Sequence, residues 1–575
     1  MINNTHFEEL KQTDTKGIAF TLANSIRELR KDSDYHATSI ALALSILDLQ
    51  NKNDLNCNSY SISNLSYSGE LKDIINKYIN DIWNIVIVNL YKFTNNELEA
   101  FILFDNSFDI IKSGLCSTPN SINQLVCEIL NLKNDDTVLE LCSGKGGFAI
   151  QACSNNNAAK FTGVELNYVA REIAVMRLSL LSSDYNLFLN NAFEYNRDEK
   201  ADKLFSNYPF MLRSPSLSVY KNKLANLFNI ASETLQKASS DWVFNLKLIS
   251  QMKDTGMSIA IMTNGSTWNA PDKNIRKFFV ESGFVEAVIS LPGKLFSDTQ
   301  IPTTMIIMSK GNDKVRLIDA TNICVKSKRN TFFSSENIEQ IVTALKRDCE
   351  YSISVDKEQL SDNEYILHAA RYLTKSVEIE NGVEFESIIK KITRGSQLKA
   401  EDLNALKSNE VTSFQYVMLS NIDNGVVSIG DEQYLSEMPL KLEKYCIKNN
   451  SIILSKIGVP TFKSAVISIP SDKKLLANGN LFVIEIDETK ADPYYIQAYF
   501  ISNAGIAAFK NIYSGASIAT ISLENLKKMI IPLPSLEKQK EIGNKYAACI
   551  DELALLKKKF NKVIDKMQHT FDEEG

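Results

Sequence analysis

The chain has 575 residues, several times the size of a typical domain, so we expect three or four units with cores of their own. Hydrophobic residues at 44% and charged residues at 23% exclude wholesale disorder or a fibrous protein. The sequence has no run of roughly 20 apolar residues that could span a membrane, and its first residues lack the apolar segment of a signal peptide. We therefore expect a cytoplasmic protein without a membrane partner.

Charge and cysteine content narrow the possible partners. The net charge of -6 argues against a protein that coats nucleic acid indiscriminately. Residues 381–575 carry 24 basic and 24 acidic side chains, so a DNA-binding surface there would need local segregation of charge. The nine cysteines form no CxxC pair, which predicts reduced, mostly buried thiols and no metal site.

Residues 1–110 are predicted to form a helical N-terminal domain. Apolar residues recur at three-to-four spacing in 21–50 and 71–93, as on one face of a helix. The segment between them, 51–70, is rich in Asn and Ser, which favours a loop. No pattern in this region is typical of a catalytic site.

Residues 111–375 are predicted to form an α/β domain. Short apolar runs near residues 138, 162, 187 and 204 alternate with helical stretches such as 167–181. This order is typical of βαβ units and of a parallel sheet covered on both faces, as in Rossmann-like folds. Apolar runs near residues 259, 287 and 306 would add strands to the same sheet.

The last two predicted units are an α+β domain, 376–535, and a C-terminal coiled-coil helix, 536–575. The first has dispersed short strands and turns. The second has a heptad stripe with steps of four and three residues, which calls for a partner helix. The stripe consists of Ile542, Tyr546, Cys549, Leu553, Leu556, Phe560, Val563 and Met567.

A glycine-rich turn follows the first predicted strand of the α/β domain. Residues 138–148 are an apolar strand, a turn with Gly144, Gly146 and Gly147, and the start of a helix. Glycines let the backbone approach a ligand at the carboxyl end of a strand. About twenty residues later Glu165 ends the next strand, where a carboxylate can accept both hydroxyls of a ribose. Alternatively, Glu165 is a surface acid that caps the helix 167–181.

The turn has the form ELCSGKGG rather than GxGxxG, and it resembles motif I of class I methyltransferases. That resemblance implies S-adenosylmethionine, not NAD, as cofactor. Thr118-Pro119 resembles the motif that lies beside the methionine moiety in this family, and Asn191 stands where an Asp usually contacts the adenine. The cofactor-binding residues so implied are Thr118, Pro119, Glu140, Cys142, Ser143, Gly144, Gly146, Gly147, Phe148, Glu165, Asn191 and Asn207.

Asn207, Tyr208, Pro209 and Phe210 follow another predicted strand and are the candidate catalytic residues. An Asn side-chain carbonyl and the next backbone carbonyl can together accept both hydrogens of an exocyclic amine. The nitrogen lone pair is then directed at an electrophilic methyl group without a general base. Phe210 would stack on a base flipped out of a duplex.

The sequence SNYPF resembles the (D/N)PP(F/Y) motif of amino-methyltransferases, and the order of motifs resembles the modification subunit of type I restriction systems. Residues 291–304 are similar to that family's LPxxLF…IPT signature. The resemblance implies methylation of adenine N6 in DNA. Two residues depart from it: Tyr208 replaces a proline but still supplies a carbonyl, so we expect activity. Asn191 replaces an acid: it keeps one acceptor but loses the charge, so we expect the replacement to affect cofactor affinity.

Residues 385–540 resemble one target-recognition half of a type I specificity subunit. The similarity is carried by 416–425, 448–458, 494–500, 515–518 and 531–539. It implies binding of double-stranded DNA. Four basic residues of this segment could contact phosphates, or could simply be solvated surface charges: Arg394, Lys399, Lys456 and Lys463.

One recognition half followed by a heptad helix predicts that two chains pair through residues 536–570 to read a split, palindromic site. The alternative is pairing with a helix of another subunit, such as a specificity chain or a translocating endonuclease. The sequence has no nuclease cluster and no GxxxxGK[ST] loop, so any cleavage would come from a partner.

The predicted function is sequence-specific adenine-N6 DNA methylation within a restriction-modification or phage-defence system. A catalytically silent DNA-binding subunit is an alternative, motivated by Tyr208 and Asn191. Methylation of protein glutamine or RNA is another, against which the recognition half argues. Chemistry alone does not separate adenine N6 from cytosine N4, and only the family resemblance favours adenine.

Overall fold

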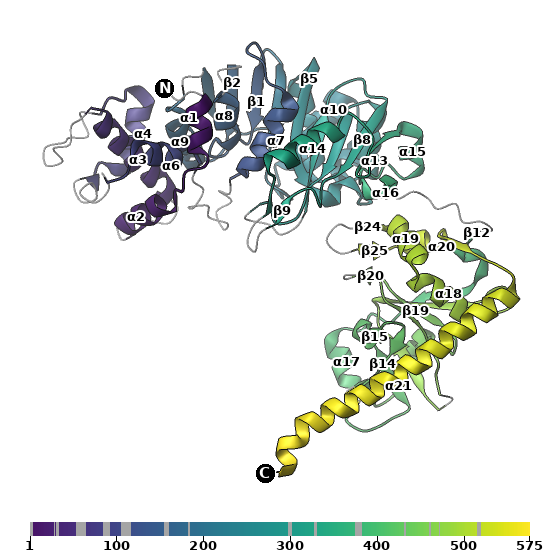
Figure 1. The fold of residues 1–575 in the computed structure, drawn as a ribbon. Helices are drawn as coiled ribbons and strands as arrows, with labels where there is room; N and C mark the ends of the chain where they lie inside the picture. Colours follow the sequence, from purple (N-terminus) through teal and green to yellow (C-terminus); the bar gives the residue numbers. More distant parts are fainter. Residues whose placement is uncertain are drawn as a thin grey trace. The chain divides into compact units, whose positions relative to one another are not determined.

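The computed structural model describes residues 4–27, 29, 34–52, 65–83, 92–104, 117–154, 160–181, 184–296, 302–326, 331–373, 382–430, 433–458, 462–470, 472–514 and 519–574. The chain divides into two compact units, residues 1–373 and 374–575. Figure 1 shows the fold and labels many of the helices and strands of both units.

The N-terminal part of unit 1 is helical, as its apolar spacing predicts. Its helices are α1 (Asn4–Leu10), α2 (Lys16–Ile26), α3 (Tyr35–Asn51), α4 (Gly69–Ile79) and α6 (Asn95–Phe104). Helix α3 is buried from His36 to Leu49, so the other helices pack around it. Of the helix predicted over 71–93, α4 accounts for the first part, while 84–91 lie outside the described residues.

The centre of unit 1 is a sheet with the strand order β11-β8-β6-β7-β5-β4-β1-β2-β3 among the described residues. Its strands are β1 (Thr137–Leu141), β2 (Lys160–Glu165), β3 (Tyr185–Leu189), β4 (Ala201–Ser206), β5 (Met252–Thr263), β6 (Val285–Ser290), β7 (Thr303–Met308), β8 (Lys314–Asp319) and β11 (Ser352–Asp356). The expectation of a parallel sheet holds for β1 to β5 but is wrong for β7, which is antiparallel to both β5 and β6. The chain turns back after β6 at the same edge instead of crossing a face, so the sheet is mixed.

Helices cover both faces of this sheet and create two cores. Along β4 and β5, Phe205 and Ile259 point to one core and Leu204 and Ala260 to the other, as the two-residue period of a strand requires. The first core contains α7 (Asn120–Leu130), α8 (Gly147–Cys153), α9 (Tyr168–Leu178) and the N-terminal helices. The second contains α10 (Leu217–Phe228), α12 (Ser240–Gln251) and α13 (Lys273–Glu281). The N-terminal helices therefore share a core with the sheet.

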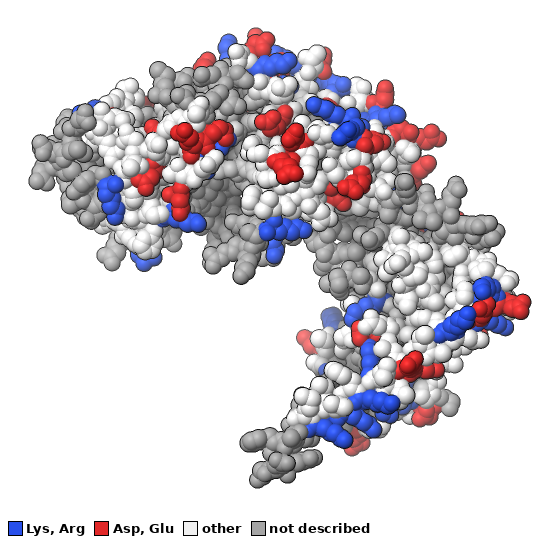
Figure 2. Space-filling view, in the orientation of Figure 1, with Lys and Arg blue, Asp and Glu red and all other residues white. Residues whose placement is uncertain are grey.

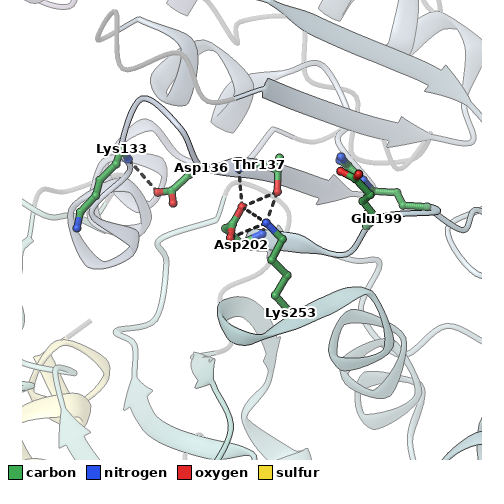
Figure 3. Close-up of polar contacts among 7 residues, drawn as sticks. Lys133, Asp136, Thr137, Glu199, Asp202 and Lys253 are labelled. Carbon is green, nitrogen blue, oxygen red and sulfur yellow. Dashed lines mark hydrogen bonds and ion pairs between the residues drawn. The ribbon is translucent and has the colours of Figure 1, made fainter.

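Asp202 fixes the starting ends of three strands relative to one another (Figure 3). Its Oδ2 accepts hydrogen bonds from the Thr137 amide at 2.9 Å and the Thr137 hydroxyl at 2.7 Å, where β1 begins. Lys253, at the start of β5, donates to the same carboxylate at 2.8 Å. Since β1, β4 and β5 are parallel, this alignment also fixes how their carboxyl ends meet at the opposite edge of the sheet.

Unit 2 is an α+β unit, as predicted. One four-stranded sheet has the order β13 (Ile389–Arg394), β23 (Leu481–Ile486), β19 (Ile452–Ser455) and β21 (Ser464–Val466). A second has the order β17 (Tyr434–Leu435), β14 (Phe414–Val417), β22 (Lys474–Ala477) and β18 (Cys446–Ile447). The short strands are β12 (Gly382–Glu384), β15 (Ile422–Asp423), β16 (Val426–Val427), β20 (Ile457–Gly458), β24 (Tyr513–Ser514), β25 (Ala519–Ile521) and β26 (Ile530–Pro532), and the helices are α17 (Ala400–Leu406), α18 (Pro493–Ile501), α19 (Asn503–Ile512), α20 (Leu523–Lys527) and α21 (Leu536–Glu574).

Helix α21 begins by packing on its own unit. Gly425 lies so close to Tyr546 and Ile550 that any side chain there would collide with them, and Gly543 lies equally close to Asp492. Further along, Lys557 forms an ion pair of 2.5 Å with Asp423. The predicted heptad stripe is therefore not one continuous partner-binding surface, because its first residues already have a partner within the chain.

The C-terminal half of α21 has a different surface. Its apolar side chains are more than half exposed, and Lys side chains gather beside them (Figure 2). The exposed apolar residues are Leu555, Leu556, Phe560, Val563 and Met567. Among the described residues, none of the helices combines the length and apolarity needed to span a bilayer.

The cysteines that the structure describes are free thiols. The expectation that most are buried is wrong for Cys349 and Cys549, which are exposed, and among the described cysteines only Cys153 is fully buried. Cys57 and Cys116 lie outside the described residues.

Candidate active site

A cavity of about 640 Å³ opens at the carboxyl ends of β1, β2, β3 and β4. Four segments that follow these strands form most of its wall: the glycine turn, residues 164–168, residues 190–193 and residues 207–210. The wall also includes Tyr220 of α10, Phe244 of α12 and Phe296. The strand order places β4 and β2 on either side of β1, so the glycine turn lies between the other candidate segments.

The glycine turn has a backbone that few residues other than glycine adopt. Cys142, Gly144 and Gly146 have φ angles of 59°, 53° and 78°. A Cβ atom on Gly146 would lie 3.0 Å from Cβ of Ala174, so glycine also lets α8 approach α9. At Gly144, in contrast, nothing among the described residues lies within 4 Å of such an atom, and this position faces the cavity.

Glu165 holds this turn in place. Its Oε2 accepts from the Gly144 amide at 2.8 Å, and its Oε1 accepts from the Asn167 amide at 2.7 Å. Each carboxylate oxygen keeps lone pairs for further acceptance, and the side chain lines the cavity. The cap of helix α9 is Asn167, whose side chain accepts from the Ala170 amide, so capping is not the role of Glu165.

The N-terminal helices reach the glycine turn through buried basic side chains. Lys145 lines the cavity and lies with its Nζ 3.4 Å from Nδ1 of His36 in α3. Arg177 of α9 donates to the carbonyl of Lys145 at 3.3 Å and to that of Ile102 in α6 at 2.8 Å. Burial, together with Lys145 and Arg177, lowers the pKa of His36 well below its usual value.

Glu140 lies beneath the turn. Its side chain is 3% exposed, and Oε2 accepts no hydrogen bond from any residue that the structure describes. Burial raises the pKa of this carboxyl well above its usual range, and the nearby Glu165 carboxylate adds to the effect. Glu140 does not line the cavity, so any contact with a ligand there would be indirect.

Asn207 lines the cavity and carries a buried amide oxygen. Its Nδ2 donates to the Thr118 hydroxyl at 2.9 Å, which orients the amide. Its Oδ1 is buried and has no hydrogen-bond partner within the described part of the chain, although the residue lines the cavity. A buried acceptor without a partner is energetically costly, so such an atom marks a place where a ligand can donate a hydrogen bond.

Tyr208 points its ring into the second core. The ring is 1% exposed and stacks on Phe244 with centroids 4.6 Å apart and planes at 10°. Its hydroxyl donates to Oδ1 of Asn245 at 3.2 Å, and burial raises the pKa of Tyr208 well above its usual value. The side chain that replaces the motif's proline therefore supports the wall of the cavity instead of blocking it.

Aromatic rings line much of the cavity. Phe210 meets Phe296 edge to face, with centroids 5.9 Å apart. At the end of β3, Phe193 stacks on Tyr220 at 4.9 Å and 14° and packs on Phe244 at 4.5 Å. Sequence reasoning missed Tyr220 and Phe244. Both lie on helices, and the sequence did not show which helical face would meet the cavity.

The structure brings eight of the predicted site residues to the cavity wall: Cys142, Gly144, Glu165, Asn191, Asn207, Tyr208, Pro209 and Phe210. Others lie behind the wall: Thr118, Pro119, Glu140, Ser143, Gly146, Gly147 and Phe148. The Phe148 ring packs in the core against Phe205 at 4.7 Å. Gln300 and Ile301 of the IPT signature lie outside the described residues.

The predicted DNA-contacting residues of unit 2 mostly share one end of a sheet. Arg394, at the end of β13, pairs with Phe482, which pairs in turn with Leu454 near the end of β19. Lys456 follows β19, and the carbonyl of Lys463 accepts from the Ser455 amide at 2.7 Å. Lys399 lies apart, at the start of α17. Residues 515–518 lie outside the described residues.

Two family models match the chain. Residues 101–381 match the model described as N-6 DNA Methylase, and residues 389–565 match the type I restriction modification DNA specificity domain. The first match contains the cavity, and the second contains both four-stranded sheets of unit 2.

Among curated proteins, the type I restriction enzyme MpnII methylase subunit of Mycoplasma pneumoniae is 25% identical over 339 residues, which cover 52% of this chain and 61% of that protein. The HindI methylase subunit of Haemophilus influenzae is 24% identical, covering 49% of this chain and 68% of that protein. The chain thus spans about two thirds of the length of these relatives.

Two solved structures have a similar fold. The methyltransferase subunit of a type I restriction-modification system from Streptococcus thermophilus has a TM-score of 0.51 at 18% identity, covering 62% of this chain and 99% of that chain. The type IIG restriction endonuclease BpuSI has a TM-score of 0.52 at 12% identity, covering 92% of this chain and 75% of that chain.

Proposed function

From the N-6 DNA methylase domain and the type I DNA specificity domain that this chain carries, we propose that it is a DNA methyltransferase that uses S-adenosylmethionine and modifies adenine N6 at a specific sequence. We place it in a restriction-modification or phage-defence system that acts on cytoplasmic DNA. The observation that carries the proposal is that Asn207, whose buried Oδ1 has no hydrogen-bond partner among the described residues, lines one cavity with the glycine turn.

The residues around the cavity fit the cofactor. The open side of Gly144 leaves room for a ligand against the backbone, and the Glu165 carboxylate has lone pairs for the hydroxyls of a ribose. Asn191 and the aromatic rings near the end of β3 suit an adenine, which is flat and has an amino group. When bound, the cofactor supplies an electrophilic methyl group.

The target amine would be held by two acceptors. Oδ1 of Asn207 and the backbone carbonyl of Tyr208 would each accept one hydrogen of the exocyclic amine. Nitrogen gains positive charge as it attacks, and two fixed acceptors stabilise that charge more than they stabilise the neutral amine. Such acceptance also orients the lone pair, so the amine needs no general base before it attacks.

The base must leave the duplex to reach Asn207. Unstacking a base costs a few kcal/mol, and aromatic contacts in the enzyme can offset part of that cost. Phe210 and Phe296 line the cavity near Asn207 and offer aromatic surface for the extruded base. We assign them this role in preference to the rings near Asn191.

Unit 2 would read the DNA sequence. Arg394, Lys456 and Lys463 lie at one end of a sheet, where their side chains would form a local basic surface in a domain whose overall charges balance. Phosphate contacts from such side chains position a protein on DNA, while neighbouring polar side chains can contact base edges. Cleavage, where it occurs, would be supplied by a partner protein.

The exposed half of α21 supports a proposal about assembly. Leu556, Phe560, Val563 and Met567 continue the heptad stripe and are each more than half exposed. A second copy of the chain could cover this stripe through the same residues, forming a two-fold coiled coil that places two reading domains on a split site.

The direct test is transfer of labelled methyl groups to unmodified genomic DNA by the purified chain, followed by digestion to nucleosides. We expect label in N6-methyladenine. Asn207→Ala removes the acceptor and should lower the transfer rate about 100-fold.

Label in N4-methylcytosine would contradict the choice of base, and equal rates for wild type and Asn207→Ala would contradict the role of Asn207. The alternative, a catalytically silent DNA-binding subunit, predicts no label from either protein, with or without cofactor binding. The burial of the Tyr208 ring away from the amine-binding groups supports the active enzyme over this alternative.

A further inference from the structure

A chain of hydrogen bonds runs along the cavity wall where β3 ends. The Tyr220 hydroxyl donates to Oε1 of Glu194 at 2.7 Å. Nδ2 of Asn191 donates to the oxygen of the same hydroxyl at 3.3 Å, and Oδ1 of Asn191 accepts from the Phe193 amide at 2.9 Å. Asn191, Phe193 and Tyr220 all line the cavity.

Both ends of this chain impose the same orientation on the Asn191 amide. A carboxylate only accepts, so Tyr220 must donate its proton to Glu194 and can offer only its oxygen to Asn191. A backbone amide only donates, so the Phe193 N–H requires the oxygen of Asn191. The hydrogen bond to Glu194 raises the pKa of Tyr220 above its usual value, which keeps the proton on the hydroxyl.

The fixed orientation of the Asn191 amide matters because this asparagine stands where the family usually has an acid. A carboxylate presents an acceptor to its ligand in every rotamer, whereas a free carboxamide can turn and present either an oxygen or an NH2 group. With Nδ2 held by Tyr220, the oxygen of Asn191 keeps one lone pair beyond the bond from Phe193. That lone pair can accept from an amino group.

We propose that Tyr220 and Glu194 are positioning residues that lock the Asn191 amide as an acceptor for the amino group of the cofactor's adenine. The inference rests on the proposed function, since it requires an adenosyl ligand in this cavity. In this chain the two residues supply the fixed acceptor that an aspartate would provide by itself.

The Tyr220 hydroxyl can be removed without removing the ring. The ring stacks on Phe193 with planes at 14°, and Tyr220→Phe keeps this contact. The variant therefore isolates the hydrogen-bond chain from the packing of the cavity wall.

The test is a calorimetric titration of the full chain with two ligands, S-adenosylhomocysteine and S-inosylhomocysteine. They differ at position 6 of the purine, where an amino donor is replaced by an oxygen acceptor, and at N1, which is an acceptor in the adenosyl ligand and carries a hydrogen in the inosyl ligand. Wild type should prefer the adenosyl ligand at least tenfold, because a fixed Asn191 oxygen faces an acceptor in the inosyl ligand. Tyr220→Phe and Glu194→Gln should each reduce this preference at least fivefold, by weakening only adenosyl binding or by also strengthening inosyl binding.

Two controls separate this role from a general effect on the cavity. Tyr168→Phe also removes a hydroxyl from a cavity-lining ring but leaves the Asn191 contacts intact, so the preference should not change. In an Asn191→Asp background, Tyr220→Phe should also leave the preference unchanged, because a carboxylate has no donor face to turn.

The proposal is overturned if Tyr220→Phe leaves the ratio of the two affinities unchanged, or weakens both ligands equally. A different failure would contradict the proposed function: neither ligand binds to folded wild type. Binding of the adenosyl ligand with an unchanged ratio would leave the methyltransferase proposal standing and remove only the role of Tyr220 and Glu194.

Discussion

The two polar atoms of the Asn207 amide differ in their hydrogen bonding: Nδ2 already forms a hydrogen bond, and Oδ1 forms none with the described residues. Thr118 fixes Nδ2, so the amide cannot turn freely, and Oδ1 lies buried at the cavity without a partner among the described residues. Thr118 belongs to the segment before α7 and does not line the cavity, whereas Asn207 and Gly144 both do. A single hydroxyl behind the wall thus prepares an acceptor for a ligand in front of it.

Tyr208, which replaces the motif's proline, contributes to the stability of unit 1 through the packing of its buried ring. We predict that Tyr208→Pro, although it restores the family motif, destabilises unit 1 by about 3–5 kcal/mol, because it removes a buried ring that stacks on Phe244. Tyr208→Phe loses only the hydrogen bond to Asn245 and should cost about 1 kcal/mol. Urea unfolding followed by circular dichroism measures both variants. A Tyr208→Pro variant as stable as wild type would refute this interpretation.

The sequence predicted the polar residues of the cavity wall, but it did not predict the aromatic residues that helices contribute to the wall. Glu165, Asn191 and Asn207 each follow a parallel strand, and the ends of such strands meet at one edge, so their convergence followed from the strand pattern. Tyr220 and Phe244 come from helices of a core that packs from all sides. No periodicity shows which ring of such a helix will reach the cavity.

At the scale of elements, Asp202 ties the starts of β1, β4 and β5 together. Its hydrogen bonds to Lys253 and Thr137 lower its pKa to about 2, against the opposing effect of partial burial. Since the folded-state pKa lies below the unfolded value of 3.8, this stabilisation is fully present above about pH 4 and is lost as pH falls toward 2.

We therefore predict that Asp202→Asn lowers the stability of unit 1 by about 1–2 kcal/mol at pH 7. The difference in Tm between variant and wild type should shrink as the pH is lowered from 5 toward 2. Because Asp202 lies at the opposite end of the strands from the cavity, the Kd for S-adenosylhomocysteine should not change. A pH-independent difference in Tm would show that the carboxylate charge is not responsible.

Helix α21 has a feature that its sequence pattern could not predict. The apolar spacing in α21 predicted one helix with a heptad stripe, and the helix is present. The stripe is divided because Gly425 and Asp492 of the same chain contact residues around Tyr546 and Gly543. A heptad pattern looks the same whether its partner is in the same chain or another, so only the structure separated the two halves.

For the whole molecule, the exposed apolar residues of α21 lead to a prediction about its oligomeric state. We predict that the wild-type chain is a dimer in solution and that Phe560→Glu together with Val563→Glu yields a monomer, because charges on an apolar seam cannot be buried without a large cost. Sedimentation velocity gives the two masses. Ala554→Glu, a substitution at an exposed position of the same helix outside the heptad stripe, is the matched control and should remain a dimer. A monomeric wild type would contradict self-pairing and leave a different subunit as the partner of this helix.

On the proposed function, catalysis and DNA reading lie in one polypeptide. Unit 1 contains the cavity, and unit 2 contains the basic end of the β13–β23–β19–β21 sheet. The chain divides into its two compact units at residue 373, and the predicted domain boundary near residue 375 stays a prediction. The finer boundary near residue 110 stays a prediction, since the N-terminal helices share a core with the sheet.

We propose that this chain by itself methylates adenine N6 at a defined DNA sequence. Sequencing that detects modified bases, applied to DNA from a host without adenine methylation that expresses only this chain, measures base, site and self-sufficiency together. We expect N6-methyladenine at one recurrent sequence, and much less of it when Asn207→Ala is expressed at the same level. Unmodified DNA from cells that contain the folded, cofactor-binding wild type would contradict it.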